Sequence, residues 1–144
     1  MKQLNKTQSA LFVAGGVLMV IGAGSYAATW MQQVACWVFL TGSLLFTIMQ
    51  QMQSYEGQNF VIRRLKNIMS FAHLCFVLSG LLMADSAYGF MLRAFSNYMD
   101  YYTYLYNKWV VLLLVAAILE VYTMHRIDNE LKKENNSDSK QTKQ

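Results

Sequence analysis

The sequence predicts an all-α integral membrane protein, a four-helix bundle with an external amphipathic segment between helices three and four. Three observations lead to this prediction. Of the 144 residues, 55% are hydrophobic and only 14% are charged, well below the roughly 25% that is typical of soluble domains. Long stretches of the chain carry no charge at all. Finally, nearly all Lys and Arg residues fall on one side of the predicted bundle.

The first charge-free stretch contains two helices. No Asp, Glu, Lys or Arg occurs in the 49 residues between Lys6 and Glu56. As one helix this run would be about 74 Å long at ~1.5 Å per residue, far more than a hydrocarbon core of ~30 Å. The run must therefore fold back once, and the polar patch at 29–33 is the natural turn. We place the helices at about 10–28 and 34–52.

Two further apolar runs provide the third and fourth helices. One is free of charge over 67–84, and the other begins at Trp109 and meets its first charge at Glu120. Both are continuous rather than alternating, which favours helices over the strands of a membrane barrel. We place these helices at about 67–88 and 108–126.

The transmembrane domain therefore covers 1–126. The chain turns polar after this point, and we predict a cytoplasmic tail over 127–144 that is largely disordered.

The orientation follows from the distribution of basic residues. Arg93 and Lys108 are the only two on the side of the external segment. Because cytoplasmic loops are enriched in Lys and Arg, both termini are predicted to be cytoplasmic, in a multi-pass protein of a bacterial inner membrane. The basic pI of about 9.1 then reflects topology, and we expect no nucleic-acid partner. The ten residues on the terminal side are Lys2, Lys6, Arg63, Arg64, Lys66, Arg126, Lys132, Lys133, Lys140 and Lys143.

A cleaved signal peptide is the alternative for the first helix. Basic residues, an apolar run and Ser25-Tyr26-Ala27 resemble a leader with a small-residue cleavage site. The apolar run is longer than a usual leader and three more spans follow it, so we favour an uncleaved helix.

The external segment carries aromatic residues at helical spacing. Six residues step by four, three, four, three and four, which is one stripe of a helix. Such a stripe is typical of an interfacial helix whose tyrosines lie at headgroup level. A binding platform for a sugar or a periplasmic partner is the alternative. The stripe contains Met91, Phe95, Tyr98, Tyr102, Leu105 and Trp109.

His73 and Glu120 form the candidate buried polar pair. His73 lies seven residues from Lys66 and Glu120 six from Arg126, which places them about 10 Å and about 9 Å inside the same boundary. An ionised Glu at that depth is costly unless it is paired. We therefore predict a contact between the two, with a contact from Glu120 to Arg63 or Arg64 at the interface as the alternative.

The sequence carries no catalytic signature. His73 and His125 lie at different depths without a metal-ligand spacing, and the two cysteines, Cys36 and Cys75, differ in depth by roughly 8 Å, too far for a disulfide. We expect no enzyme, no metal and no cofactor.

Small residues indicate close helix packing. In helix one they recur at seven residues, and helix three carries a similar face. The pattern predicts tight association, within one chain more than between chains. The residues are Gly15, Gly16, Gly22, Ala23 and Gly80.

The stretch 55–65, together with 116–122, resembles a group of short bacterial four-helix membrane proteins. The resemblance implies the same topology and no mechanism. Within the first stretch, Arg63 and Arg64, with Lys66 just beyond it, are candidates to contact anionic lipid headgroups.

Two functional hypotheses remain. The first is an interaction, accessory or envelope-maintenance protein that acts in the bilayer through a partner protein. The second is a small dimeric transporter or proton-coupled carrier that uses Glu120 and His73, since ionisable residues inside a membrane indicate function by default.

Overall fold

The computed structural model describes residues 5–53 and 55–141. Four long helices run side by side: α1 (Lys6–Ala27), α2 (Gln32–Gln51), α3 (Phe60–Tyr88) and α5 (Trp109–Gln141). A 3-10 turn, η1 (Met91–Ala94), and a short helix, α4 (Tyr98–Tyr104), connect α3 to α5. Four helical stretches, α1, α2, α3 and the one that contains α5, are long and apolar enough to cross a membrane. The all-helical architecture that the sequence predicted is therefore present in the described part of the chain.

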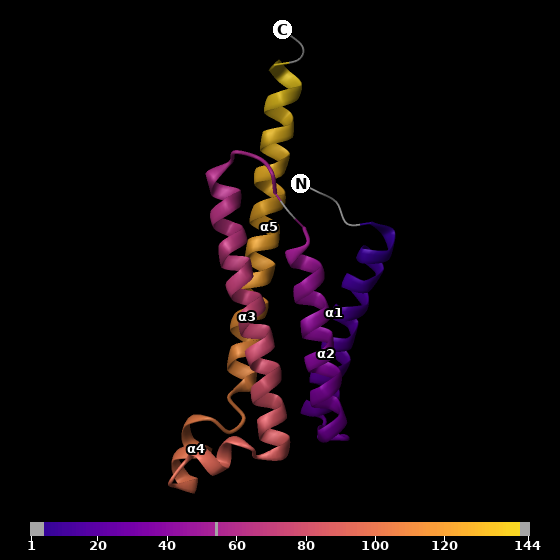
Figure 1. Ribbon diagram of the computed structural model, residues 1–144. Coiled ribbons are helices and arrows are strands. Elements are labelled where there is room, and N and C mark those ends of the chain that lie inside the picture. The colour runs from indigo at the N-terminus through magenta and orange to yellow at the C-terminus, as the bar shows by residue number, and fades with distance from the viewer. Residues whose placement is uncertain (1–4, 54, 142–144) are drawn as a thin grey trace.

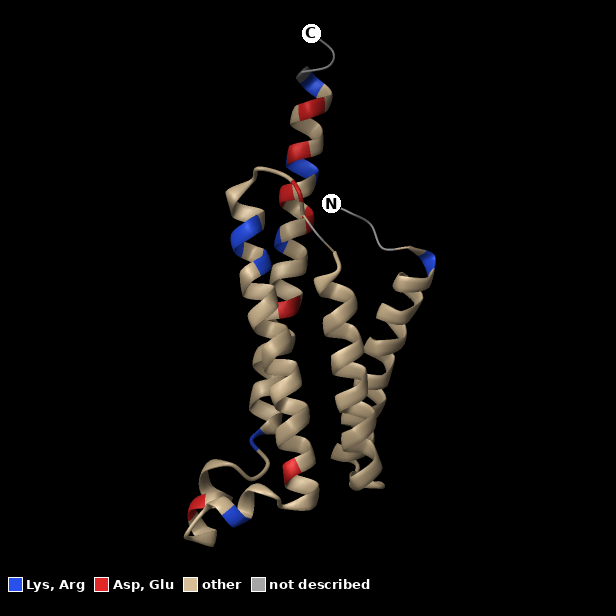
Figure 2. Cartoon of the chain, in the orientation of Figure 1, with Lys and Arg blue, Asp and Glu red and all other residues tan. Residues whose placement is uncertain are grey.

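The helices pack in the order α1, α2, α3, α5 (Figure 1). α1 begins and α5 ends at the same end of the bundle, which we call the terminal end. The opposite end carries the turn between α1 and α2 and the segment with η1 and α4. Charged residues gather toward these two ends (Figure 2), as expected for helices whose middle lies in hydrocarbon.

The first two helices form a hairpin through glycine contacts. A Cβ atom added to Gly15 or Gly22 of α1 would lie within 3 Å of the backbone of α2, and one added to Gly42 would meet α1 in the same way. Gly80 of α3 faces Leu40 and Phe39 of α2. The small-residue faces therefore serve packing within the chain, which is the interpretation that the sequence favoured.

Helix α3 begins seven residues before its predicted start at 67. The Asn59 side chain accepts a hydrogen bond from the Val61 amide at 3.0 Å and caps the helix. The added turns pack Ile62 and Leu65 against Ile127 of α5. Arg63, Arg64 and Lys66 therefore lie in the first turns of a helix and not in a loop.

Helix α5 continues to Gln141, through most of the tail that the sequence predicts to be largely disordered. Ile127 and Leu131 bury apolar surface against α3, and Lys132 pairs with Asp128 one turn earlier at 2.6 Å. Such pairs support a solvated helix. The last three residues of the predicted tail, 142–144, and the two basic residues Lys2 and Lys143 lie outside the described residues.

The external amphipathic segment is not one helix. It breaks between η1 and α4 and again at Asn107, where φ is +60°. On the predicted stripe Trp109 is buried, but Tyr98 is 72% exposed. The buried aromatic of α4 is instead Tyr101, which lies off the stripe. The two breaks shift the helical register, so a regular 3.6-residue spacing places the wrong side chain inward.

Candidate functional site

His73 of α3 and Glu120 of α5 lie against each other inside the bundle. The imidazole Nε2 lies 3.4 Å from Oε1 and 3.3 Å from Oε2 of Glu120. His73 is only 2% exposed and Glu120 only 6%. The contact that the sequence predicted between them is present. The alternative partners Arg63 and Arg64 are exposed and form no ion pair with Glu120 in the described part of the chain.

Neighbouring side chains hold the pair in place. The ring of Phe46 packs edge-on against the imidazole, with centroids 5.9 Å apart. On α5, the Thr123 hydroxyl donates to the carbonyls of Leu119 and Glu120 at 2.7 and 3.0 Å. Ala116, one turn before Glu120, is fully buried and leaves room for the carboxylate. Three helices therefore fix the geometry of the pair.

Several polar atoms around the pair have no hydrogen-bond partner among the described residues. They are Thr47 Oγ1, Gln50 Oε1, His73 Nδ1 and Glu120 Oε2. Oε2 of Glu120 is within ion-pair distance of His73, but the hydrogen bond of the pair runs to Oε1. We call Thr47, Gln50, His73, Glu120 and Thr123 the polar centre.

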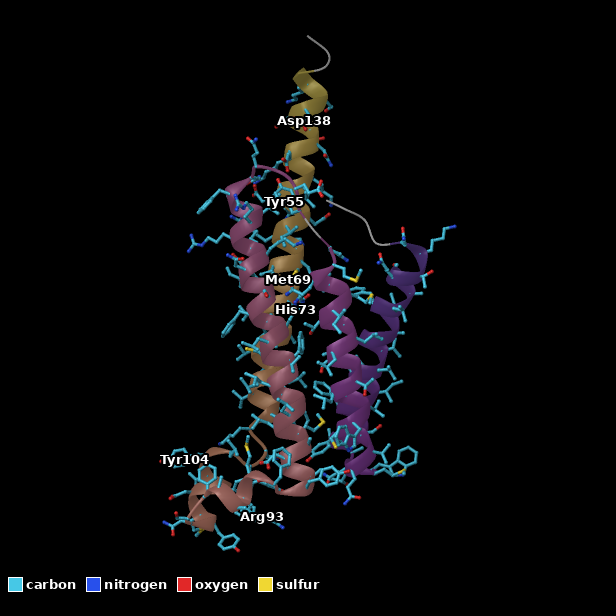
Figure 3. The ribbon with its side chains drawn as sticks, viewed as in Figure 1. Tyr55, Met69, His73, Arg93, Tyr104 and Asp138 are labelled. Atoms are coloured by element: carbon cyan, nitrogen blue, oxygen red, sulfur yellow. The ribbon has the colours of Figure 1, made fainter. Side chains whose placement is uncertain are left out.

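The polar centre belongs to the terminal half of the bundle. Gln50 Nε2 donates to Met69 Sδ at 3.3 Å, and Gln51 Nε2 donates to Ser70 Oγ at 2.9 Å. Both contacts join the terminal end of α2 to α3, where Figure 3 shows Met69 and His73. The sequence did not indicate these two amides, because each looks like an ordinary interfacial glutamine.

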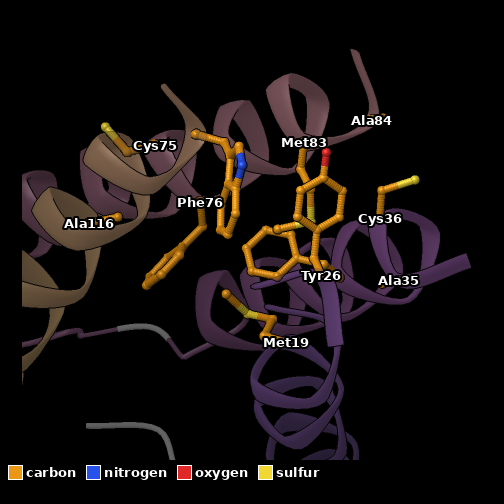
Figure 4. Close-up of a cluster of buried hydrophobic side chains, with 11 residues drawn as sticks. Met19, Tyr26, Ala35, Cys36, Cys75, Phe76, Met83, Ala84 and Ala116 are labelled. Atoms are coloured by element: carbon orange, nitrogen blue, oxygen red, sulfur yellow. The ribbon is translucent and has the colours of Figure 1, made fainter. Parts of the chain in front are cut away.

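An apolar layer separates the polar centre from the opposite end. Buried side chains from all four long helices fill the bundle there (Figure 4). Ser43 and Ser79, which are buried in the same part, donate to the carbonyls of Leu40 and Trp109 at 2.8 Å. Their hydroxyls are thus satisfied by backbone. The layer includes Met19, Phe39, Cys75, Phe76, Met83 and Ala116.

A second buried carboxylate lies at the opposite end. Asp85, in the last turn of α3, is only 1% exposed. Its Oδ2 accepts a hydrogen bond from the Tyr101 hydroxyl at 2.8 Å, and its Oδ1 accepts one from the Met91 amide at 2.7 Å. Asp85 therefore fastens η1 and α4 to the end of α3. The sequence contained an indication of this contact. Asp85 lies in the last turn of a helix, where a negative charge is disfavoured by the helix dipole and needs a specific partner.

The terminal end has its own contact between a loop and a helix. Tyr55, in the connection from α2 to α3, donates a hydrogen bond to Glu134 of α5 at 2.9 Å. Desolvation by its neighbours, and then the Glu134 carboxylate, raise the pKa of the Tyr55 phenol above its ordinary value of 10.0. This hydrogen bond holds the loop against the extended part of α5.

The three predicted lipid-contact residues differ in their surroundings. Arg63 and Arg64 are exposed, as a lipid contact requires. Lys66 is half-buried, and its ammonium donates to the Gln53 carbonyl. The contact of Lys66 with a headgroup stays a prediction, because an ammonium that donates one hydrogen bond to a carbonyl keeps its charge and two further N–H groups.

The packing residues lie as follows. A Cβ added to Gly16 would make only an ordinary contact with the Phe46 ring, and Ala23 packs at the edge of the apolar core. Cys36 and Cys75 are free and buried. Among the described residues, no group of three His, Cys, Asp or Glu side chains converges on one point where a metal ion could bind.

Comparison of the chain with protein-family models finds no match, and comparisons with curated proteins and with solved structures find none either. The resemblance to short bacterial four-helix membrane proteins therefore stays a prediction. The function has to be argued from the geometry of the chain itself.

Proposed function

We propose that the protein lies in a bacterial inner membrane with both termini in the cytoplasm. Support comes from four apolar helices and from the basic residues at the terminal end. Reporter fusions after Lys133 and within residues 96–106 test this orientation. A reporter that is active in the periplasm after Lys133 would contradict it.

Within this membrane, the proposed role is that of an accessory protein that associates with another protein. The observation that carries the proposal is the confinement of the polar centre to the terminal half of the bundle. About 18 Å along α3 separates His73 from Asp85, and the buried side chains between them are apolar or satisfied by backbone. A proton carrier needs access to its site from both sides, whereas association needs no path across the membrane.

The extension of α5 supplies a surface for such association. Beyond Leu131 and Glu134 its side chains are exposed and carry both signs of charge, and the helix projects past α3 (Figure 1). A solvated helix of this kind is available to a cytoplasmic partner or to the cytoplasmic face of a membrane protein.

Photo-crosslinking in cells tests the association. A photoreactive residue is placed at Asn129 or Asn136 of α5, and the matched control is placed at Val20, which is 73% exposed on an apolar helix. We expect a discrete crosslinked protein from the α5 positions and only lipid adducts from Val20. Equal, diffuse products from all three positions would contradict the accessory role.

The second candidate is a proton-coupled carrier, and the contact between His73 and Glu120 favours it. A carboxylate and an imidazole in contact can share and release a proton in the membrane. The test is proton movement into vesicles that contain the purified protein and an internal pH dye. Acidification that Glu120→Gln abolishes would establish the carrier and overturn the accessory role.

A further inference from the structure

A groove opens on the flank of the bundle between α2 and α3. It has a volume of about 550 Å³. Its polar lining consists of Thr47 and Gln51 from α2 and of Asn67, Ser70 and His73 from α3. Its apolar lining consists of Phe71, Leu74 and Val77. The groove shares Thr47 and His73 with the polar centre, and Glu120 is not part of its lining.

We propose that this groove binds one anionic phospholipid from the leaflet at the terminal end. Two features support the assignment: the order of polarity along α3, which begins with the exposed Arg63, and the unpartnered polar atoms in the lining. The proposal stands whether or not the protein has a protein partner.

The order of polarity along α3 matches that of a phospholipid. Arg63, Asn67, Ser70 and Val77 follow at spacings of four, three and seven, so they share one face of the helix. Arg63 lies about 10 Å above Ser70, and Val77 lies about 10 Å below it. A cation, then hydroxyl and amide groups, and then apolar side chains correspond to phosphate, glycerol esters and acyl chain.

The lining offers hydrogen-bonding capacity that the chain does not use. Thr47 Oγ1 and His73 Nδ1 are buried and lack a partner among the described residues. His73 is 2% exposed and its Nε2 already faces Glu120. The Thr47 hydroxyl can donate to an ester carbonyl oxygen. An ester carbonyl at this depth would remove the cost of leaving that hydroxyl unpaired.

The charge next to the groove favours an anionic lipid over a neutral one. The groove lining itself contains no Lys, Arg, Asp or Glu, and Arg63 stands exposed above Asn67. An arginine near the surface attracts an anionic headgroup, and its guanidinium is suited to bidentate contact with a phosphate. Lys66 is half-buried and donates to Gln53, whereas Arg63 is exposed.

Arg64 provides a matched control. It carries the same charge one residue later, about 100° further round the helix and farther from α2. α2 meets α3 through Met69, His73 and Gly80. A lipid held in the groove should therefore depend on Arg63 and not on Arg64.

The experiment is native mass spectrometry of the delipidated full-length protein, titrated with phosphatidylglycerol or with phosphatidylcholine of the same chain length. We expect the first bound lipid to favour phosphatidylglycerol. Arg63→Ala should weaken that binding about fivefold, the effect of one surface arginine, while Arg64→Ala changes it less than about twofold. Equal loss from the two variants would overturn the proposal, because lipid would then follow overall charge.

A second pair of variants tests the groove itself. Ser70→Leu places a larger apolar side chain in the groove and should weaken both lipids. Asn67→Leu does the same without removing the hydroxyl that accepts a hydrogen bond from Gln51, and it serves if Ser70→Leu fails to fold. Unchanged binding in a folded blocking variant would overturn the proposal. Displacement of the lipid by glycerol phosphate would also overturn it, because the apolar half of the groove would then contribute nothing.

Discussion

Nε2 of His73 lies 3.3 Å from Oε2 of Glu120 inside the bundle, and the other ring nitrogen, Nδ1, has no partner among the described residues. One imidazole thus joins α3 to α5 and also lines the groove between α2 and α3. This position makes the pair important for helix packing as well as for any chemistry.

Replacement of Glu120 separates hydrogen bonding from charge. Glu120→Gln keeps an acceptor for the imidazole and should cost less than about 1 kcal/mol of unfolding free energy. Glu120→Leu leaves Nε2 buried without an acceptor and should cost about 1–3 kcal/mol. Thermal unfolding in detergent measures both, with Ile118→Ala at an exposed position of α5 as the control. Equal losses from the Gln and Leu variants would show that the negative charge itself stabilises the packing.

The contact between His73 and Glu120 could be predicted because depth and helix face depend only on counting residues along regular helices. Counting was sufficient because α3 and α5 are regular around both residues. The glycine contacts of α1 were predictable for the same reason. The sequence did not show that Gly42 would be their partner, since that depends on how the hairpin crosses.

The other differences between the predicted and the observed structure have physical causes. The start of α3 was placed at 67 because charged residues were taken as the end of the span, yet Ile62 and Leu65 pack on Ile127 beyond the predicted boundary. The contact between Asp85 and Tyr101 depends on non-helical backbone between η1 and α4, which no residue spacing reveals. Tyr101 in particular lies off the aromatic stripe that the spacing indicated.

Removal of the Asp85 carboxylate should release the segment 89–108 from α3. Asp85→Ala removes the acceptor of Tyr101 and of the Met91 amide, and we expect faster hydrogen exchange in this segment by about tenfold or more, equivalent to about 1.4 kcal/mol. Asp85→Asn retains an acceptor oxygen and should have a smaller effect. Asp100→Asn, at an exposed position of α4, is the matched control. Unchanged exchange in Asp85→Ala would mean that aromatic packing alone holds the segment.

The hydrogen bond between Tyr55 and Glu134 predicts that the folded protein loses stability at alkaline pH. The phenol has its pKa raised above 10.0 in the folded protein, first by desolvation and then by the carboxylate that accepts its hydrogen bond. The stabilisation is therefore fully present below pH 10.0 and is lost as the pH rises through the raised pKa. Phenolate absorbance of the wild type minus that of Tyr55→Phe isolates this group among the nine tyrosines. A difference signal that titrates at or below 10.0 would contradict the contact.

Two glycines of α1 provide a test of the hairpin packing. A Cβ added to Gly22 would lie 2.6 Å from the Phe39 backbone nitrogen, whereas one added to Gly24 meets nothing within 4 Å. Because backbone cannot move aside as a flexible side chain can, Gly22→Ala should force α1 and α2 apart and cost about 1–3 kcal/mol. Gly24→Ala should be neutral or stabilise the helix by up to about 1 kcal/mol. Thermal unfolding in the same detergent measures the stability of both variants. Equal stability of the two variants would show that the close approach of α1 and α2 at Gly22 does not exist in the folded protein.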